Sequence, residues 1–210
     1  VASPYTASYA VGTYNFMCNN TQTQNYTSNQ VQNTLTVIPQ PGSIIGKIND
    51  TNNNIYGAII QLKNGSLTVA QTITNITGDY SLTAMEGSYT LIITKAGFIG
   101  NTTSQTIVGG STISYNYTLT QDSSTSGAVS GTVYDVNTFV IIPNAYIRIE
   151  AGTVIQYVRS DALGNYRING LPSSSPYNLF ASRNDILYTQ FASNVGIPIG
   201  GISSGVDAFI

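Results

Sequence analysis

The stretch GDYSLTAMEGSYTLIITKAGF, residues 78–98, decides the fold because its apolar residues return at every second position. The alternation is clearest in Tyr89, Leu91 and Ile93, which are separated by threonine or isoleucine. A period of two places successive side chains on opposite faces of a β-strand. Gly78 can take the positive φ of a turn just before the first run. The stretch therefore predicts two short strands, each with one face in a core.

The pattern returns about 86 residues later, which indicates an internal repeat. The first copy spans 42–121 and the second spans 127–210. The matched pairs are Gly46 with Gly131, Ala58 with Ala145, Gly78 with Gly164, and Tyr80 with Tyr166. Apolar residues at helical spacing behind an N-cap are absent from the sequence. We therefore predict an all-β chain of tandem β-sandwiches with an incomplete segment of strands at the N-terminus.

The motif G-x-Y-x-L/I, with a Gly-x-Val/Ile first strand and L-x-x-G-x-Y-x-L further on, resembles the carboxypeptidase regulatory-like domain. That resemblance implies a β-sandwich of the prealbumin type. It covers 42–121 well and 127–210 less well, because the second copy has SSSPYNLFASRND in place of EGSYTLIITKAGF. The motif indicates the fold but does not indicate an activity, because such modules occur as spacers or binding units in many exported proteins.

Residues 1–40 precede the first copy and predict three strands, over 5–11, 13–18 and 30–37. The pattern GTYNF…NYTSN…LTV resembles the F and G strands of Ig-like domains from archaeal and bacterial surface proteins. Three strands cannot close a sandwich, so we expect an apolar face and open edges that pair with another chain. The alternative is that these residues are the last strands of an upstream Ig-like domain in a larger surface protein. The first residue, Val1, indicates that a signal or precursor segment has been removed.

The segment at 1–11 is the expected donor of a strand to a neighbouring copy, because YTASYAV alternates and lies at a chain end. The expected donor residues are Tyr5, Ala7, Tyr9 and Val11. The C-terminal segment GVDAFI is the second candidate donor.

Composition excludes several function classes. Only 8% of the residues are charged, and the seven Lys and Arg are too scattered to bind nucleic acid. The apolar runs are too short for a membrane-spanning helix. With no His and one Cys, the usual acid–base and nucleophile pairs are missing, so we expect no enzyme activity and no cofactor. Acidic residues such as Asp135, Glu150 and Asp161 do not have the Asp-x-Asp-x-Asp spacing of a calcium-binding loop.

Seven Asn-x-Ser/Thr sequons occur in the chain, all before residue 120. A polar composition can produce such triplets without glycosylation, and that alternative stays open. Their positions near expected turns favour N-glycans and therefore an extracellular or cell-surface location. The candidate asparagines are Asn19, Asn25, Asn49, Asn64, Asn75, Asn101 and Asn116.

Four smaller expectations follow from single residues. Cys18 is expected as a small buried residue of a strand, with an intermolecular bridge as the alternative. Lys47 and Asn116 are the candidates for an isopeptide bond beside an acid, Glu86. The polar segment 121–127 predicts a linker of limited flexibility. The aromatic candidates for sugar stacking are Tyr134, Tyr146, Tyr157 and Tyr188.

Neutral composition, sequon density, tandem sandwiches and the unfinished N-terminus together resemble an archaeal extracellular thread. That resemblance implies a homopolymer, assembled from copies of this chain by strand donation. The alternative is an adhesive or sugar-binding module of a larger secreted or S-layer-associated surface protein.

Overall fold

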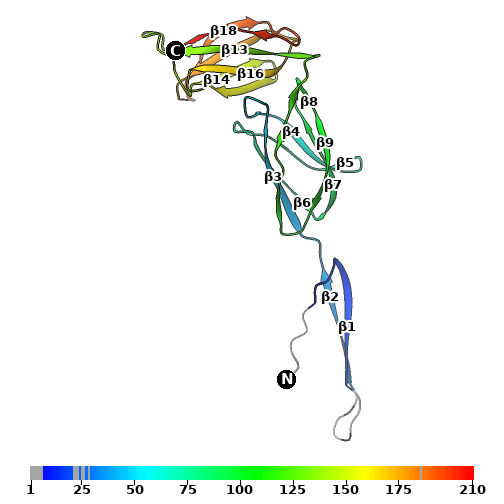
Figure 1. Ribbon diagram of the computed structural model, residues 1–210. Helices are drawn as coiled ribbons and strands as arrows, with labels where there is room; N and C mark the ends of the chain where they lie inside the picture. The colour runs from blue at the N-terminus through cyan, green and yellow to red at the C-terminus, as the bar shows by residue number, and fades with distance from the viewer. Residues whose placement is uncertain (1–6, 21–23, 25–26, 28, 185) are drawn as a thin grey trace.

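The computed structural model describes residues 7–20, 24, 27, 29–184 and 186–210. It consists of a two-stranded hairpin followed by two β-sandwiches that form an elongated chain (Figure 1). No helix occurs among the described residues, so the all-β prediction is confirmed. The described residues accordingly hold no helix with the length and apolar character needed to cross a membrane.

The hairpin, residues 12–37, pairs β1 (Gly12–Asn20) with β2 (Asn29–Val37) in antiparallel register. Neither strand pairs with a strand of the two sandwiches. Within the single chain, residues 7–10 of the strand expected over 5–11 pair with no strand, and residues 5 and 6 lie outside the described residues. A strand needs a neighbour for its backbone hydrogen bonds, and here the segment instead lies against the hairpin through Tyr9.

The first sandwich, residues 41–121, packs two sheets around an aliphatic core. One sheet has the order β5-β4-β7-β9, and in the other β3 pairs with β6 on one side and with β10 and β11 on the other. Ile44, Ile60 and Leu91 are fully buried between the sheets. The strands are β3 (Pro41–Asn49), β4 (Ile59–Asn64), β5 (Leu67–Ile73), β6 (Asp79–Met85), β7 (Gly87–Thr94), β8 (Phe98–Ile99), β9 (Asn101–Ile107), β10 (Thr112–Ser114), β11 (Tyr117–Thr118) and β12 (Thr120–Gln121).

The second sandwich, residues 126–210, repeats this topology around its own core. One sheet has the order β15-β14-β17-β18, and in the other β13 pairs with β16, β19 and β20. The strands are β13 (Ser126–Tyr134), β14 (Tyr146–Ala151), β15 (Val154–Arg159), β16 (Asn165–Pro172), β17 (Tyr177–Ser182), β18 (Thr189–Val195), β19 (Ile202–Ser203) and β20 (Ala208–Phe209). Since β20 pairs with β13 and Ala208 is fully buried, the C-terminal segment completes its own sandwich.

The glycine and tyrosine of the repeat form the same contact in both sandwiches. The Tyr80 hydroxyl donates to the carbonyl of Tyr115 at 2.7 Å, and burial raises the pKa of Tyr80 to about 12, so it stays a donor. The Tyr166 hydroxyl donates in the same way to the carbonyl of Val206 at 2.5 Å. A Cβ on Gly46 would lie 1.9 Å from that Tyr115 carbonyl oxygen. The glycine is therefore required by close packing of strands.

We expect Gly46→Ala to lower the free energy of unfolding by about 1–3 kcal/mol, because the backbone must shift to admit a methyl group. Urea unfolding followed by circular dichroism measures the change. Gly196→Ala is the matched control, since a Cβ there would meet nothing within 4 Å. Equal stability of Gly46→Ala and the control would contradict the close packing.

A buried polar network joins the two sandwiches. The Asp50 carboxylate accepts hydrogen bonds from the backbone N–H groups of Asn52 at 2.7 Å and Asn53 at 2.6 Å. From the second sandwich, Asn169 Nδ2 donates to Asp50 Oδ2 at 3.1 Å and Arg167 Nε donates to Asn169 Oδ1 at 2.7 Å. Asp50 and Asn169 are only 6% and 5% exposed. The network therefore fixes the loop after β3 against strand β16 of the second sandwich.

The segment between the sandwiches, where the sequence predicts a linker of limited flexibility over 121–127, is a capped turn. Ser124 and Thr125 donate hydrogen bonds to the Asp122 carboxylate, and these bonds lower the pKa of Asp122. The Ser126 hydroxyl donates to the carbonyl of Gly97 at 2.9 Å, which ties the turn back to the first sandwich. Side-chain caps of this kind restrict the backbone conformations of a polar segment, and composition alone does not reveal them.

Candidate assembly surface and glycosylation sites

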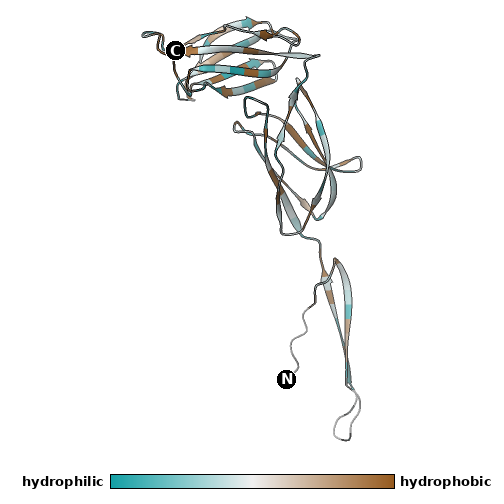
Figure 2. Ribbon diagram, in the orientation of Figure 1, coloured by the Kyte–Doolittle hydropathy of each residue, from teal (hydrophilic) through white to brown (hydrophobic). Residues whose placement is uncertain are grey.

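The hairpin has one apolar face and one polar face because its residues alternate. We define the apolar face as the apolar side chains that share one side in the paired register, where Asn33 opposite Phe16 is polar: Tyr14, Phe16, Cys18, Val31, Leu35 and Val37. Phe16 is 38% exposed, Leu35 41% and Val31 50%. Figure 2 shows the hairpin standing away from both sandwiches. No described residue of either sandwich is paired with it, so this face lacks the second layer that a β-sheet needs.

The Tyr9 ring is the aromatic group that packs on the apolar face. Its centroid lies 4.8 Å from that of Tyr14 and 5.5 Å from that of Phe16. The Tyr14 hydroxyl donates to the carbonyl of Ala10 at 2.8 Å and holds the segment there. Of the predicted donor residues, Ala7 and Val11 are exposed, Tyr9 is half-buried and Tyr5 lies outside the described residues. Their role as a donor strand stays a prediction.

The polar face of the hairpin satisfies its own hydrogen bonds. The Thr34 hydroxyl donates to Asn15 Oδ1 at 2.9 Å, and Gln30 Nε2 lies 2.6 Å from the Met17 sulfur. Asn19 lies on this face because it alternates with Cys18. A glycan on Asn19 would therefore leave the apolar face uncovered.

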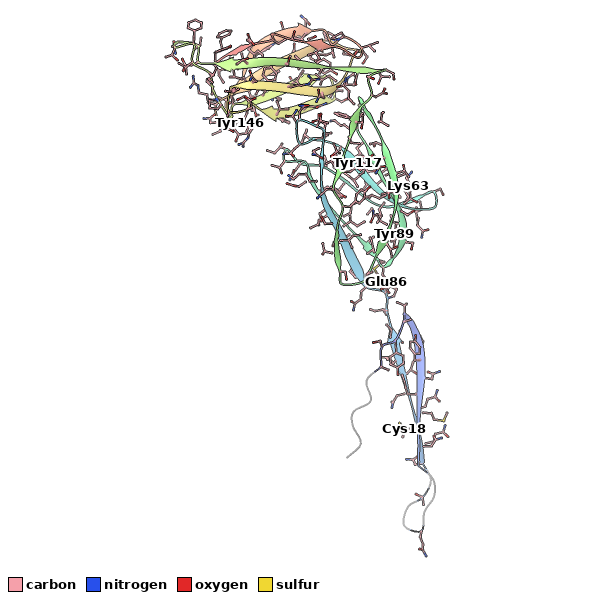
Figure 3. The ribbon with its side chains drawn as sticks, viewed as in Figure 1. Cys18, Lys63, Glu86, Tyr89, Tyr117 and Tyr146 are labelled. Carbon is pink, nitrogen blue, oxygen red and sulfur yellow. The ribbon has the colours of Figure 1, made fainter. Side chains whose placement is uncertain are left out.

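Cys18 is exposed, so the expectation that it is buried is wrong. The alternation correctly places Cys18 on the apolar face of the hairpin. Burial also requires a layer over that face, and no described element supplies it. Figure 3 shows Cys18 near the distal end of the hairpin.

Two sequon asparagines accept backbone N–H groups with their amide oxygen, Asn75 within a turn and Asn116 from strand β3, and leave the amide nitrogen available. Asn75 Oδ1 accepts the N–H groups of Thr77 and Asp79, both at 2.9 Å, and Asn116 Oδ1 accepts the N–H of Lys47 at 2.8 Å. Both asparagines are exposed. In the second sandwich, the carboxylates of Asp161 and Asp207 accept the corresponding bonds. The fold therefore needs an acceptor at these positions, which either residue type supplies.

The asparagines of the other sequons differ in how far they are exposed to solvent. Asn64 is exposed beside the β4–β5 turn, whereas Asn49 is half-buried and accepts a hydrogen bond from Thr118. Asn101 is half-buried, and its Nδ2 donates to the Tyr115 hydroxyl at 3.1 Å. A glycan is attached through this nitrogen and replaces one of its two hydrogens, so modification of Asn101 would crowd the contact with Tyr115. Asn25 lies outside the described residues.

Of the isopeptide candidates, Lys47 and Asn116 are adjacent, whereas Glu86 lies apart from them, and the bond itself stays a prediction. Lys47 Nζ lies 2.9 Å from Asp79 Oδ1, while Asn116 contacts the backbone of Lys47. Hydrogen bonds from Thr77 and Lys47 lower the pKa of Asp79, which keeps the ion pair charged. Glu86 follows β6 at the end away from Asp79, at the lower end of the first sandwich in Figure 3.

The remaining acidic residues are dispersed. Asp135 pairs with Arg183 at 2.5 Å and Glu150 with Arg148 at 3.4 Å. Hydrogen bonds from Arg183 and from the backbone hold the pKa of Asp135 well below its usual range. No group of three His, Cys, Asp or Glu that could hold a metal ion occurs in the described part of the chain.

The four candidate tyrosines do not form one face. Tyr134 stacks on Phe209 with centroids 5.4 Å apart, and the Arg148 guanidinium lies over the Tyr188 ring at 5.3 Å. Only Tyr146 and Tyr157 line a common groove, together with residues of the first sandwich. Sequence reasoning could not identify that groove, because its two sides come from segments that are about 100 residues apart.

No protein-family model matches the chain. Chitinase ChiA of Flavobacterium johnsoniae is 27% identical over 203 residues, which cover 82% of this chain and 12% of that protein. The chain thus spans about an eighth of this relative's length.

Solved structures with some similarity include the Bacillus anthracis TIE protein, with a TM-score of 0.36, 16% identity, and coverage of 85% of this chain and 36% of that one. The shaft pilin SpaA from Lactobacillus rhamnosus GG has a TM-score of 0.34, 11% identity, and coverage of 79% and 96%. A streptococcal ancillary pilin has a TM-score of 0.33, 13% identity, and coverage of 89% and 72%.

Proposed function

We propose that the chain is a structural subunit of an extracellular, N-glycosylated filament, in which copies assemble head to tail at the hairpin. The observation that carries this proposal is the apolar face, which no described strand covers and on which the described chain places the Tyr9 ring. Burial of a Phe or Leu side chain stabilises an interface by about 1.5–3 kcal/mol, so covering Phe16 and Leu35 gives a substantial driving force.

Charge favours a second copy as the occupant. Residues 12–37 contain no Asp, Glu, Lys or Arg, so covering the hairpin desolvates no charged side chain. A partner selected by charge would need at least one such group. A partner that is itself neutral and apolar fits better, and the chain provides a surface of this kind.

An exposed apolar cluster, here called the tip, lies at the far end of the second sandwich from the hairpin (Figure 1). Its members are Tyr134, Val136, Phe139, Val140, Ile141 and Phe209. Phe139 is 68% exposed and Val140 61%. When two different surfaces at opposite ends of one molecule meet, the contact does not close on itself and a filament grows.

Strand addition is a second way for copies to join at the hairpin, because the donor segment adjoins the hairpin and not the tip. β1 and β2 each have one edge that no other strand occupies in the described residues. An edge with unpaired backbone groups accepts an extended segment from another chain. Residues 5–11 of a neighbouring copy are the proposed donor, with Tyr9 and Val11 alternating toward the receiving face.

Glycan occupancy is expected to follow access to the amide nitrogen. We expect N-glycans on Asn19, Asn64, Asn75 and Asn116, which are exposed, and none on Asn101, whose Nδ2 donates to Tyr115. Mass spectrometry of peptides from the natively purified protein measures occupancy at each site. A glycan on Asn101 would contradict this expectation, and bare asparagines at all four exposed sites would remove glycosylation from the proposed function.

The proposal is tested by sedimentation velocity and negative-stain electron microscopy of the full chain over a range of concentrations. We expect linear assemblies whose length increases with concentration. A monomer at every concentration would overturn the proposed function and favour the alternative, in which the hairpin is covered by other residues of a longer surface protein.

A further inference from the structure

A groove runs along the junction of the two sandwiches. Residues 49–54 of the first sandwich form one side, and Tyr146, Tyr157 and Arg159 of β14 and β15 line the other. Its volume is about 600 Å³, and a second hollow of about 510 Å³ shares Asn52, Asn53 and Arg159 with it. Figure 3 places Tyr146 on the side of the second sandwich that faces the first. Junctions between domains and volumes of this size are typical of ligand sites.

The floor of the groove is rigid before any ligand arrives. Asp50 holds residues 52 and 53 in place and is itself bonded to Asn169 across the junction. Asn53 Nδ2 donates to the carbonyl of Arg167 at 2.5 Å, which adds a second link between the sandwiches. A site fixed in this way loses little conformational entropy when a ligand binds.

The chemistry of the groove is neutral and rich in amide and hydroxyl groups. Asp50 is the acidic residue that lines it and Arg159 the basic one. Asp50 is buried in its hydrogen bonds, and Arg159 contacts Tyr146, with the guanidinium 4.2 Å from the ring centroid. Neither residue gives the groove the excess of positive charge that a phosphate or nucleic acid requires.

Unused hydrogen-bonding groups face this space. Neither the Tyr157 hydroxyl nor the Asn54 amide has a hydrogen-bond partner in the described chain. The Tyr157 ring is fixed by an edge contact with Tyr56, whose centroid is 5.1 Å away. An amide supplies two donors and an acceptor, and a tyrosine supplies an apolar ring with a hydroxyl at its end.

From these observations we infer that the groove binds a neutral oligosaccharide. Sugar hydroxyls act as donors and acceptors and therefore match the unused amide of Asn54, while the apolar face of a sugar ring matches Tyr157. This inference goes beyond the proposed assembly and does not depend on it, because the groove uses no residue of the hairpin or the tip.

Isothermal titration of the full chain, below the concentration at which it assembles, tests the site with chitohexaose, cellohexaose and maltohexaose in turn. We expect at least one of them to bind. For that probe, Tyr157→Ala should weaken affinity about 10-fold or more and Asn54→Ala about 5-fold. Tyr188→Ala is the matched control and should leave the affinity unchanged, because Tyr188 does not line the groove.

Asn54 is exposed, so Asn54→Ala keeps the inference testable if Tyr157→Ala disturbs folding. Absence of binding by all three probes would overturn the site. Binding that survives both groove substitutions would also overturn it, since the sugar would then occupy another surface. Neither result affects the assembly proposal, which is measured without sugar.

Discussion

Replacing Phe16 and Leu35 together by aspartate is expected to abolish assembly. The two side chains lie on the apolar face of the hairpin and are 38% and 41% exposed in the single chain. Two carboxylates there would have to lose their hydration when a second copy covers the face, at a cost that no cation on the hairpin offsets. We expect the association constant to fall at least about 100-fold, as for central residues of an interface. Sedimentation velocity measures the change.

The matched control places the same two charges on the other face of the same hairpin. Gln32 and Thr36 are exposed on the polar face, so Gln32→Asp with Thr36→Asp should leave assembly within a few-fold of the unmodified chain. Circular dichroism checks that both variants keep their sandwiches. If both double variants lost assembly equally, the cause would be general charge repulsion, and the apolar face would have no special part in assembly.

Replacing Asp50 by alanine is expected to be among the most destabilising single changes in the chain. It leaves the N–H groups of Asn52 and Asn53 without their acceptor, and it removes one of the two acceptors of the buried Asn169 amide, which also donates to Asn52 Oδ1. Each unsatisfied buried donor costs about 1–3 kcal/mol, so we expect a loss of about 3 kcal/mol or more. Urea unfolding measures the loss, and small-angle scattering should show that the angle between the sandwiches becomes less defined.

Asp161→Ala is the control for this prediction. Asp161 Oδ1 accepts two backbone N–H groups in the same way, from Leu163 and Asn165, but it is exposed and makes no bond across the junction. Its loss should cost only about 1 kcal/mol, because water can replace the carboxylate. If Asp50→Ala and Asp161→Ala had equal effects, the buried network would not be what holds the sandwiches together.

The strands and cores could be predicted because their signal is local. The alternation around Leu91 and Ile93 places both residues in the core, where they are fully buried. The glycine and tyrosine of the repeat, Gly46 and Tyr80 in the first copy, mark the same close contact in each sandwich. Both features depend on neighbours within one strand or one turn, and such neighbours can be recognised in a single sequence.

The junction and the groove could not be predicted. Asp50 and Asn169 meet although 119 residues separate them, and neither lies in a pattern that indicates burial. The turn at Asp122 depends on hydroxyl groups two and three residues later, which composition describes only as polar. For Cys18, the face was predictable but its burial was not, because burial depends on a layer from outside the strand.

Alkylation of Cys18 is the most direct test of the central claim that a second copy covers the apolar face. Cys18 is the only cysteine in the sequence and is exposed on that face, so N-ethylmaleimide reports on one position. We predict rapid reaction in dilute solution and a rate at least about 10-fold lower in the assembled protein. A rate that is unchanged by assembly, or a Cys18 already protected in the dilute monomer, would contradict the account.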